Sequence, residues 1–313
     1  MASAIFHKLA PISVRAAAGC GTFLVCVIWV WLFGGAAVSI SQAEQVTLGV
    51  SRFPDDLDLL GSEHEAAWLV RQAVGEGLMR RHNPEGPADP PYRLGSSESV
   101  RSNQDASSWS FRLKPGVVFA NGREVGLSDL SFSLERCQKV GALTGVKEVE
   151  YRRVRSGFDR ISLGVDMQLT RSNPEFPMQL GGCPILDGQA GRVFGEDFGR
   201  RTNVVATGRY EIIDYHAGRQ IVLRLTPVAR SQGGRGPEEI VLRGFEEEKA
   251  GLTALRVGTI SSFFTSSPEI FSKAESDETL ALMECEGRPL VRRKSFHFGC
   301  KSNLNVSEFK TEM

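Results

Sequence analysis

Alternating hydrophobic and polar positions predict β-strands in four places along the chain. Residues 45–50 and 109–113 alternate with a period of two, which is typical of strands that bury one face. Residues 210–215 and 220–225 form two further runs, separated by a short polar segment. The Asn-Gly dipeptide at 121–122 strongly favours the tight turn of a β-hairpin. The pattern therefore predicts hairpins in two separate parts of the chain.

Hydrophobic residues at helical spacing predict amphipathic helices between these strands. Ser62 and Glu65 match a capping box, in which each side chain bonds the backbone amide of the other residue at the start of a helix. Ser128 and Asp129 cap a second predicted helix, and the acidic residues 246–248 open a third. Since helices and strands alternate, the sequence predicts a mixed α/β architecture.

The first 43 residues differ in composition from the rest of the chain. They contain Lys8 and Arg15, and no further charged residue occurs before Glu44. A basic start, a long apolar run and small residues before the polar chain predict a secretory signal peptide, cleaved after Ala43. The uncharged run is also long enough to span a bilayer, so an uncleaved N-terminal membrane anchor stays open as the alternative. Either interpretation predicts export of the remaining chain.

Charge and cysteine content narrow the possible function classes and indicate one candidate disulfide. The 313 residues include 37 Lys and Arg and 37 Asp and Glu, and this balance argues against a protein that works mainly by binding nucleic acid. Four cysteines follow the N-terminal segment: Cys137, Cys183, Cys285 and Cys300. Cys285 and Cys300 are close in sequence and are the candidate pair for a disulfide in an oxidising compartment. No Cys or His spacing typical of a zinc site occurs, so no metal is predicted.

Motifs that carry catalytic chemistry are missing from the sequence. It has no phosphate-binding loop of nucleotide hydrolases, no zinc-peptidase motif and no nucleophile elbow. Asp55, Asp56 and Asp58 form a carboxylate cluster, but they lack the alternating ligands and closing glutamate of a calcium loop. The sequence therefore predicts no catalytic residue, no cofactor and no enzyme.

Several separated segments, in order, resemble the family 5 extracellular solute-binding proteins, which are the peptide, dipeptide and nickel receptors of ABC importers. The most specific segment is 109–136, where Trp-Ser-Phe-Arg-Leu-Lys-Pro-Gly leads into Phe-Ala-Asn-Gly and a helix. Residues 75–78 are similar to the family's Tyr-Glu-Gly-Leu, and residues 194–210 end in a segment similar to Val-Gly-Thr-Gly-Pro-Tyr. Residues 254–260 look like the family's Ala-Leu helix end.

The resemblance implies an α/β fold of the periplasmic binding protein type, class II and peptide-binding, with a β-rich accessory domain inserted in the first lobe. We expect the first lobe at 44–82 and 188–262, the accessory domain at 83–187, and a remnant of the second lobe at 263–313. Family members continue much further beyond the position of Ser261, so the second lobe is expected to be truncated.

The resemblance also implies a function. The protein is expected to bind a peptide or another small solute, in the periplasm or on the outer face of the cytoplasmic membrane, and to deliver it to an ABC permease. An uncleaved N-terminal segment would add a membrane contact. By position alone, six residues are expected near the ligand: Phe53, Asp56, Leu57, Asp58, Phe119 and Tyr210. The alternative is a degenerate relative that binds no solute and acts as a membrane-tethered interaction protein.

Two departures from the family pattern bear on that function. Arg209 stands where the family motif has proline, after Gly208. In peptide-binding relatives, the acid that receives the ammonium group of the ligand comes from the second lobe. The resemblance therefore supplies no such acid in this sequence.

Overall fold

The structure is a computed structural model. It describes residues 45–53, 59–60, 64–82, 84, 86, 89–156, 160–199, 202–233, 236–285 and 287–296. The predicted signal peptide or anchor, Ser62, Asp56, Leu57, Asp58 and Cys300 lie outside the described residues. No helix among the described residues is both long enough and apolar enough to cross a membrane.

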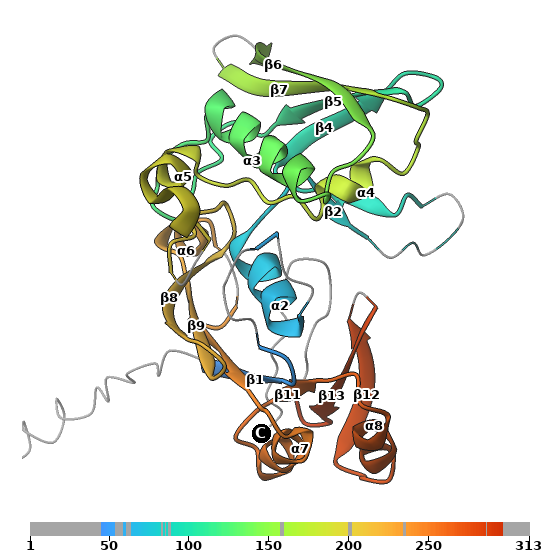
Figure 1. Cartoon of the computed structure of the whole chain (residues 1–313), viewed down its shortest axis with the longest axis vertical. Helices are drawn as coiled ribbons and strands as arrows, with labels where there is room; N and C mark the ends of the chain where they lie inside the picture. Colours follow the sequence, from blue (N-terminus) through green and yellow to red (C-terminus); the bar gives the residue numbers. More distant parts are fainter. Residues whose placement is uncertain are drawn as a thin grey trace, which may run out of the picture. The chain divides into compact units, whose positions relative to one another are not determined.

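A seven-stranded mixed sheet is built from the two ends of the described part (Figure 1). Its strands lie in the order β12-β13-β11-β1-β10-β9-β8. β1 lies inside the sheet and runs parallel to both neighbours, β10 and β11, whereas the other pairs are antiparallel. The strands are β1 Gln45–Val50, β8 Tyr210–His216, β9 Gln220–Leu225, β10 Glu239–Gly244, β11 Ser262–Phe264, β12 Leu280–Cys285 and β13 Arg288–Arg293.

Side chains alternate along the central strands, so this sheet buries both of its faces. On one face the ring of Phe264 lies 6.1 Å from that of Trp68 on α2, in the same core cluster as Leu48. On the other face Phe263 packs in a separate cluster with Leu252 of α7. The helices that follow the sheet strands are α2 Glu65–Val74, α6 Pro227–Ser231, α7 Glu248–Val257 and α8 Pro268–Glu275.

A second, four-stranded antiparallel sheet has the order β4-β5-β7-β6. Phe111 of β5 and Val165 of β7 are buried in one cluster with Leu130 and Leu134 of α3, which lies against this sheet (Figure 1). The elements here are β2 Met79–Arg81, β3 Tyr92–Leu94, β4 Ser97–Ser102, β5 Ser108–Leu113, α3 Leu127–Lys139, β6 Val146–Ser156, β7 Arg160–Leu169, α4 Pro177–Leu180, α5 Gly188–Phe194 and the 3-10 turn η1 Gly195–Asp197. The accessory-domain boundaries of 83 and 187 stay a prediction.

The strand predictions are confirmed, because β1, β5, β8 and β9 cover the four alternating runs. The predicted turn also forms. The amide of Phe119 donates to the carbonyl of Arg123 at 2.9 Å, and Gly122 adopts a positive φ of 83° between them. Glycine tolerates this left-handed conformation without steric cost.

Two predicted helix starts are wrong in detail. The N-cap of α2 is His64 and not Ser62, so Glu65 is the first helical residue and does not take part in a capping box. The N-cap of α3 is Gly126, whose amide donates to the carboxylate of Asp129 at 2.8 Å. At α2 a tertiary contact of Glu65, described below, takes the place of the predicted capping bond, whereas Asp129 makes both the capping bond to Gly126 and the tertiary contacts described below.

The structure also differs from the prediction for the segment after residue 262. We expected a remnant of the second lobe there, but β13 pairs with β11 and β12 pairs with β13 in the same sheet as β1. Leu290 and Val291 of β13 are fully buried, one in each core cluster. The described residues of this segment therefore complete the first sheet.

The described cysteines differ in their bonding, and the pairing of Cys285 with Cys300 stays a prediction. Cys285 is disulfide-bonded, whereas Cys137 and Cys183 are buried free thiols. We expect peptide mapping of the unreduced full chain to link Cys285 to Cys300, and Cys285→Ser to lower the free energy of unfolding by about 2–4 kcal/mol. The hydrogen bond with Cys137 and burial raise the pKa of the Cys183 thiol, so it should be alkylated only after unfolding. A linkage of Cys285 to any other cysteine would contradict the prediction.

Candidate functional site

The first candidate position is the edge of the sheet at the end of β1. In open α/β sheets, ligands bind outside the carboxyl ends of parallel strands, where neighbouring connections leave to opposite faces. The chain leaves β1 for α2, which packs on one face. It leaves β10 for α7 and β11 for α8, which pack on the other. The switch point of this sheet is therefore the carboxyl end of β1.

Glu65 stands at this edge, because α2 begins there. Its side chain is 6% exposed, and its Oε1 lies 3.5 Å from the hydroxyl of Ser266, just after β11. Its other oxygen, Oε2, is buried and has no hydrogen-bond partner among the described residues. Beside it, the hydroxyl of Thr265 donates to Oε1 of Glu248 at 2.7 Å. The edge thus holds a buried carboxylate with one unused acceptor.

Aromatic and cationic groups border the same edge. The guanidinium of Arg288 lies 5.5 Å from the centre of the Trp68 ring. Phe53, one of the predicted ligand residues, follows β1 and is half-buried. A Cβ atom on Gly244, at the end of β10, would lie 2.9 Å from the Phe53 ring, so the backbone of β10 approaches this ring closely.

Of the other predicted site residues, Tyr210 and Phe119 are described, and neither lies at this edge. Asp56, Leu57 and Asp58 lie outside the described residues, so their role stays a prediction. Tyr210 is 1% exposed at the start of the edge strand β8, and its hydroxyl donates to the carbonyl of Pro237 at 3.0 Å. Phe119 is fully buried in a different region, described next.

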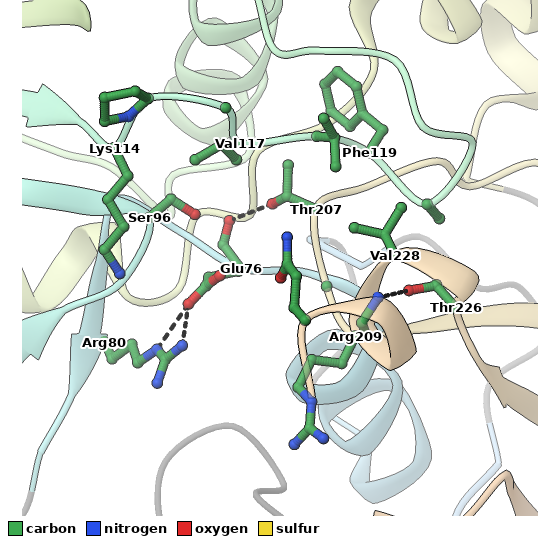
Figure 2. Close-up of a pocket in the computed structure, with 17 residues that line it drawn as sticks. Glu76, Arg80, Ser96, Lys114, Val117, Phe119, Thr207, Arg209, Thr226 and Val228 are labelled. Carbon is green, nitrogen blue, oxygen red and sulfur yellow. Dashed lines mark hydrogen bonds and ion pairs between the residues drawn. The ribbon is translucent and has the colours of Figure 1, made fainter. Parts of the chain in front are cut away.

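The second candidate position is a hollow of about 360 Å³. It is surrounded by the segment 114–120, by residues just after α2 and just before β8, and by α6. Figure 2 shows its polar groups Ser96, Glu76 and Thr207 in the middle, with Val117 and Phe119 on one side and Arg80 and Arg209 on the other. Its lining residues are Glu76, Arg80, Ser96, Lys114, Pro115, Gly116, Val117, Val118, Phe119, Ala120, Thr207, Gly208, Arg209, Thr226, Val228, Ala229 and Gln232.

The polar groups of the hollow are only partly satisfied. Glu76 forms an ion pair with Arg80, and its backbone carbonyl accepts from the hydroxyl of Thr207 at 3.0 Å. Lys114 donates from Nζ to the carbonyl of Gly95 at 2.7 Å. The hydroxyl of Ser96 is buried and has no hydrogen-bond partner in the described part of the chain. Sequence reasoning did not find Ser96, because no local motif distinguishes it from other serines.

An ion cluster supports the segment that lines the hollow. Arg123 donates from Nη1 and Nη2 to the two carboxylate oxygens of Asp129, at 2.9 and 2.7 Å. Its Nη2 also donates to Asp187 at 2.6 Å, and its guanidinium lies 4.6 Å from the centre of the Phe119 ring. Asp129 and Asp187 are 1% and 2% exposed, so one arginine compensates two buried carboxylates.

The same contacts set the protonation of this cluster. Hydrogen bonds with Asp129 and then Asp187 raise the pKa of Arg123 above its ordinary value. Burial acts to raise the pKa of Asp187, but hydrogen bonds from Arg123 and from the amide of Ala190 lower it overall. Arg123 and Asp187 are therefore charged near neutral pH. Among the described residues, no group of three or more His, Cys, Asp or Glu side chains could hold a metal ion.

Comparison with known proteins gives one family and many similar structures. The family model for bacterial extracellular solute-binding proteins, family 5 Middle, matches residues 93–294. No curated protein sequence matches the chain. Solved structures match with TM-scores near 0.6 and low sequence identity, so the likeness shows the fold.

Three of these structures illustrate the match. MoaA of A. tumefaciens R10, in complex with mannopinic acid, is 22% identical with a TM-score of 0.63, over 78% of this chain and 49% of that one. OppA of Burkholderia pseudomallei and OppA of Haemophilus influenzae, the latter in complex with RPPGFSPFR, are each 16% identical with TM-scores of 0.62, over 78% of this chain and 51% of theirs. The chain thus spans about half the length of these structures, and the expected α/β fold of the periplasmic binding protein type is confirmed.

Proposed function

Since the chain belongs to family 5 of the bacterial extracellular solute-binding proteins, we propose that it binds a peptide outside the cytoplasmic membrane and delivers it to an ABC permease. The family description supports an extracellular or periplasmic position. The peptide complexes of a Haemophilus influenzae OppA and a Bacillus subtilis AppA support the solute class. A relative bound to nickel with histidine makes the metal complex the competing solute to test.

The observation that carries the proposal is the buried carboxylate of Glu65 at the switch point of the sheet. A buried ionised carboxylate is costly unless hydrogen bonds or an opposite charge compensate it. The amides at the start of α2 compensate part of the charge, because the helix N-terminus is partially positive. Oε2 still has no hydrogen-bond partner within the described ranges.

An ammonium group suits this acceptor better than a neutral donor does. It carries three N–H donors and a full positive charge, and charge-assisted hydrogen bonds are about twice as strong as neutral ones. The free amino terminus of a peptide provides such a group. Glu65 would then supply, from the first lobe, the acid for which the family resemblance offered no residue in this chain.

The test is thermal unfolding of the full chain with pooled di- to pentapeptides. A ligand that binds only the folded state stabilises it by about 2.7 kcal/mol at a hundredfold excess over its Kd. We expect a saturable rise of the midpoint with free amino termini and at least about a tenfold weaker effect with N-acetylated pools. Glu65→Gln keeps the side-chain shape and should lose this preference. Glu269→Gln, a 58% exposed acid on α8, is the matched control and should keep it.

Each other outcome has a defined meaning. Equal affinity for free and acetylated peptides would show that Glu65 does not recognise the amino terminus, while peptide binding itself would stand. A midpoint that rises only with nickel and histidine would replace the peptide by a metal complex. If no pool moves a cooperative transition, solute binding fails, and a membrane-tethered interaction protein becomes the function to test.

A further inference from the structure

The hollow beside Ser96 and Lys114 has the chemistry of a second binding site, distinct from the sheet edge. We propose that it binds a small organic carboxylate with an apolar body, through the Ser96 hydroxyl and the Lys114 ammonium. This inference does not depend on the peptide proposal, because it uses no residue of the sheet edge.

Ser96 provides the first observation. It is 1% exposed, and its backbone is fully used: its amide donates to the carbonyl of Gly77 at 2.9 Å and its carbonyl accepts from the amide of Lys114 at 2.9 Å. Ser96 lines the hollow, and its hydroxyl has no hydrogen-bond partner among the residues that the structure describes. Buried hydroxyls are normally hydrogen-bonded, so an unused donor that faces a cavity indicates a missing acceptor.

Lys114 provides the second observation and sets the charge of the ligand. Its ammonium donates to a neutral carbonyl, that of Gly95, and no ion pair of the described residues includes it. Among the described lining residues, the cations Lys114, Arg80 and Arg209 outnumber the single acid, Glu76. The acceptor that Ser96 lacks is therefore expected to belong to an anion.

Arg209 adds a cation to the lining of the hollow at a position where the resembled family motif has none. It stands where the resembled family motif has proline, and the structure puts it in the lining of the hollow. The adjacent Gly208 leaves no room for a side chain, since a Cβ atom there would lie 2.2 Å from the backbone of Val74. The tight contact with α2 thus fixes the backbone from which Arg209 extends.

Apolar side chains form another part of the lining and favour a ligand whose uncharged part is also apolar. Val117, Phe119 and Val228 line the hollow together with the ring of Pro115. Its volume of about 360 Å³ lies within the range of small-molecule sites, roughly 300–1,000 Å³. An anion with an apolar body uses both kinds of wall, whereas inorganic phosphate or sulfate would leave the apolar side in contact with water.

The experiment is calorimetric titration of the full chain with phenylacetate, and with phenylacetamide as a neutral probe of the same shape. We expect one phenylacetate per chain and binding of the amide at least about tenfold weaker, because the charge-assisted bonds are lost. Ser96→Ala and Lys114→Gln should each weaken phenylacetate binding about tenfold. Lys273→Gln, which removes a lysine on α8 that bonds Glu269, is the matched control and should leave the affinity unchanged.

The design separates this site from the sheet edge and from misfolding. Glu65→Gln should leave phenylacetate binding unchanged. Ser96→Ala removes only a hydroxyl oxygen that makes no hydrogen bond with the described residues, so this variant should fold even if Lys114→Gln does not. In that case the phenylacetate affinity of Ser96→Ala decides whether the proposal holds. Equal affinity of acid and amide, unchanged affinity in Ser96→Ala, or no binding of phenylacetate at 10 mM, roughly the limit of specific weak binding, would each overturn the proposal.

Discussion

Replacing Arg123 by methionine is expected to lower the free energy of unfolding at pH 7 by about 3 kcal/mol. The substitution keeps an unbranched side chain of similar length but removes the cation shared by Asp129 and Asp187. Breaking a buried ion pair from one side costs about 3–5 kcal/mol, since the other charge stays buried without compensation. We expect the lower end because Arg123 itself is 33% exposed. Urea unfolding followed by circular dichroism measures the loss.

The stability lost in Arg123→Met should become smaller as the pH falls. The pKa of Asp187 in the folded protein is lowered below its ordinary value of 3.8. Its contribution to stability is therefore fully present above pH 3.8 and is lost as the pH falls through the lowered value. In Arg123→Met the buried Asp187 carboxyl loses the cation that lowers its pKa, so it should take up a proton at higher pH. The difference between the native protein and the variant should accordingly shrink from pH 7 toward pH 4, on the order of the ordinary Asp pKa.

A matched arginine separates this effect from a general loss of charge. Arg152 on β6 donates to Asp166 at 3.0 Å, but its side chain is 51% exposed. Exposed ion pairs contribute about 0–1 kcal/mol, so Arg152→Met should change stability by less than about 1 kcal/mol. Equal losses for the two variants, or a loss for Arg123→Met that does not vary with pH, would contradict the role assigned to the cluster.

Phe119→Ala is expected to cost about 3–5 kcal/mol, the range for truncating a buried phenylalanine. Phe119 is fully buried and also carries the guanidinium of Arg123 over its ring. Phe119→Leu keeps most of the volume and should cost less, about 1.5 kcal/mol. Urea midpoints of the full chain, with an unchanged slope, are the measurement.

Phe194 on α5 is the matched control, because its side chain is 38% exposed. Phe194→Ala should cost clearly less than Phe119→Ala, about 1–2 kcal/mol, since more than a third of the Phe194 surface stays in contact with water. The comparison also tests the expectation that Phe119 serves mainly as a ligand contact. A Phe119→Ala variant with unchanged stability and weaker solute binding would favour that expectation over the structural role described here.

The sequence alone was sufficient for features that depend on neighbouring residues. The period-two runs located β1, β5, β8 and β9, because alternation follows directly from the geometry of a strand with one buried face. The Asn-Gly dipeptide located the turn between Phe119 and Arg123, since only residues that tolerate positive φ form it at low cost. The ordered motifs led to the family, which the match over residues 93–294 confirms.

Features that join distant parts of the chain required the tertiary structure. Glu65 and Ser266 are 201 positions apart, and Arg123 and Asp187 are 64 apart. Local capping rules assigned Glu65 to the backbone of its own helix, but the sheet brings β11 beside β1 and offers Ser266 instead. A capping bond is worth about 1 kcal/mol, so tertiary packing easily overrides it.

The candidate binding sites were decided almost entirely by tertiary structure. Of the residues predicted by position, Phe53 lies at the sheet edge and Phe119 lines the hollow, whereas Tyr210 is used by a structural hydrogen bond. Ser96 and Glu65 are significant because they are buried without a full set of partners. Burial and partner atoms depend on the packing of segments that are far apart in sequence, whereas hydrophobic periodicity reports only which face of a single element is buried. The chain therefore encodes its strands, turns and family in local patterns, and its acceptor and donor sites in the way those elements assemble.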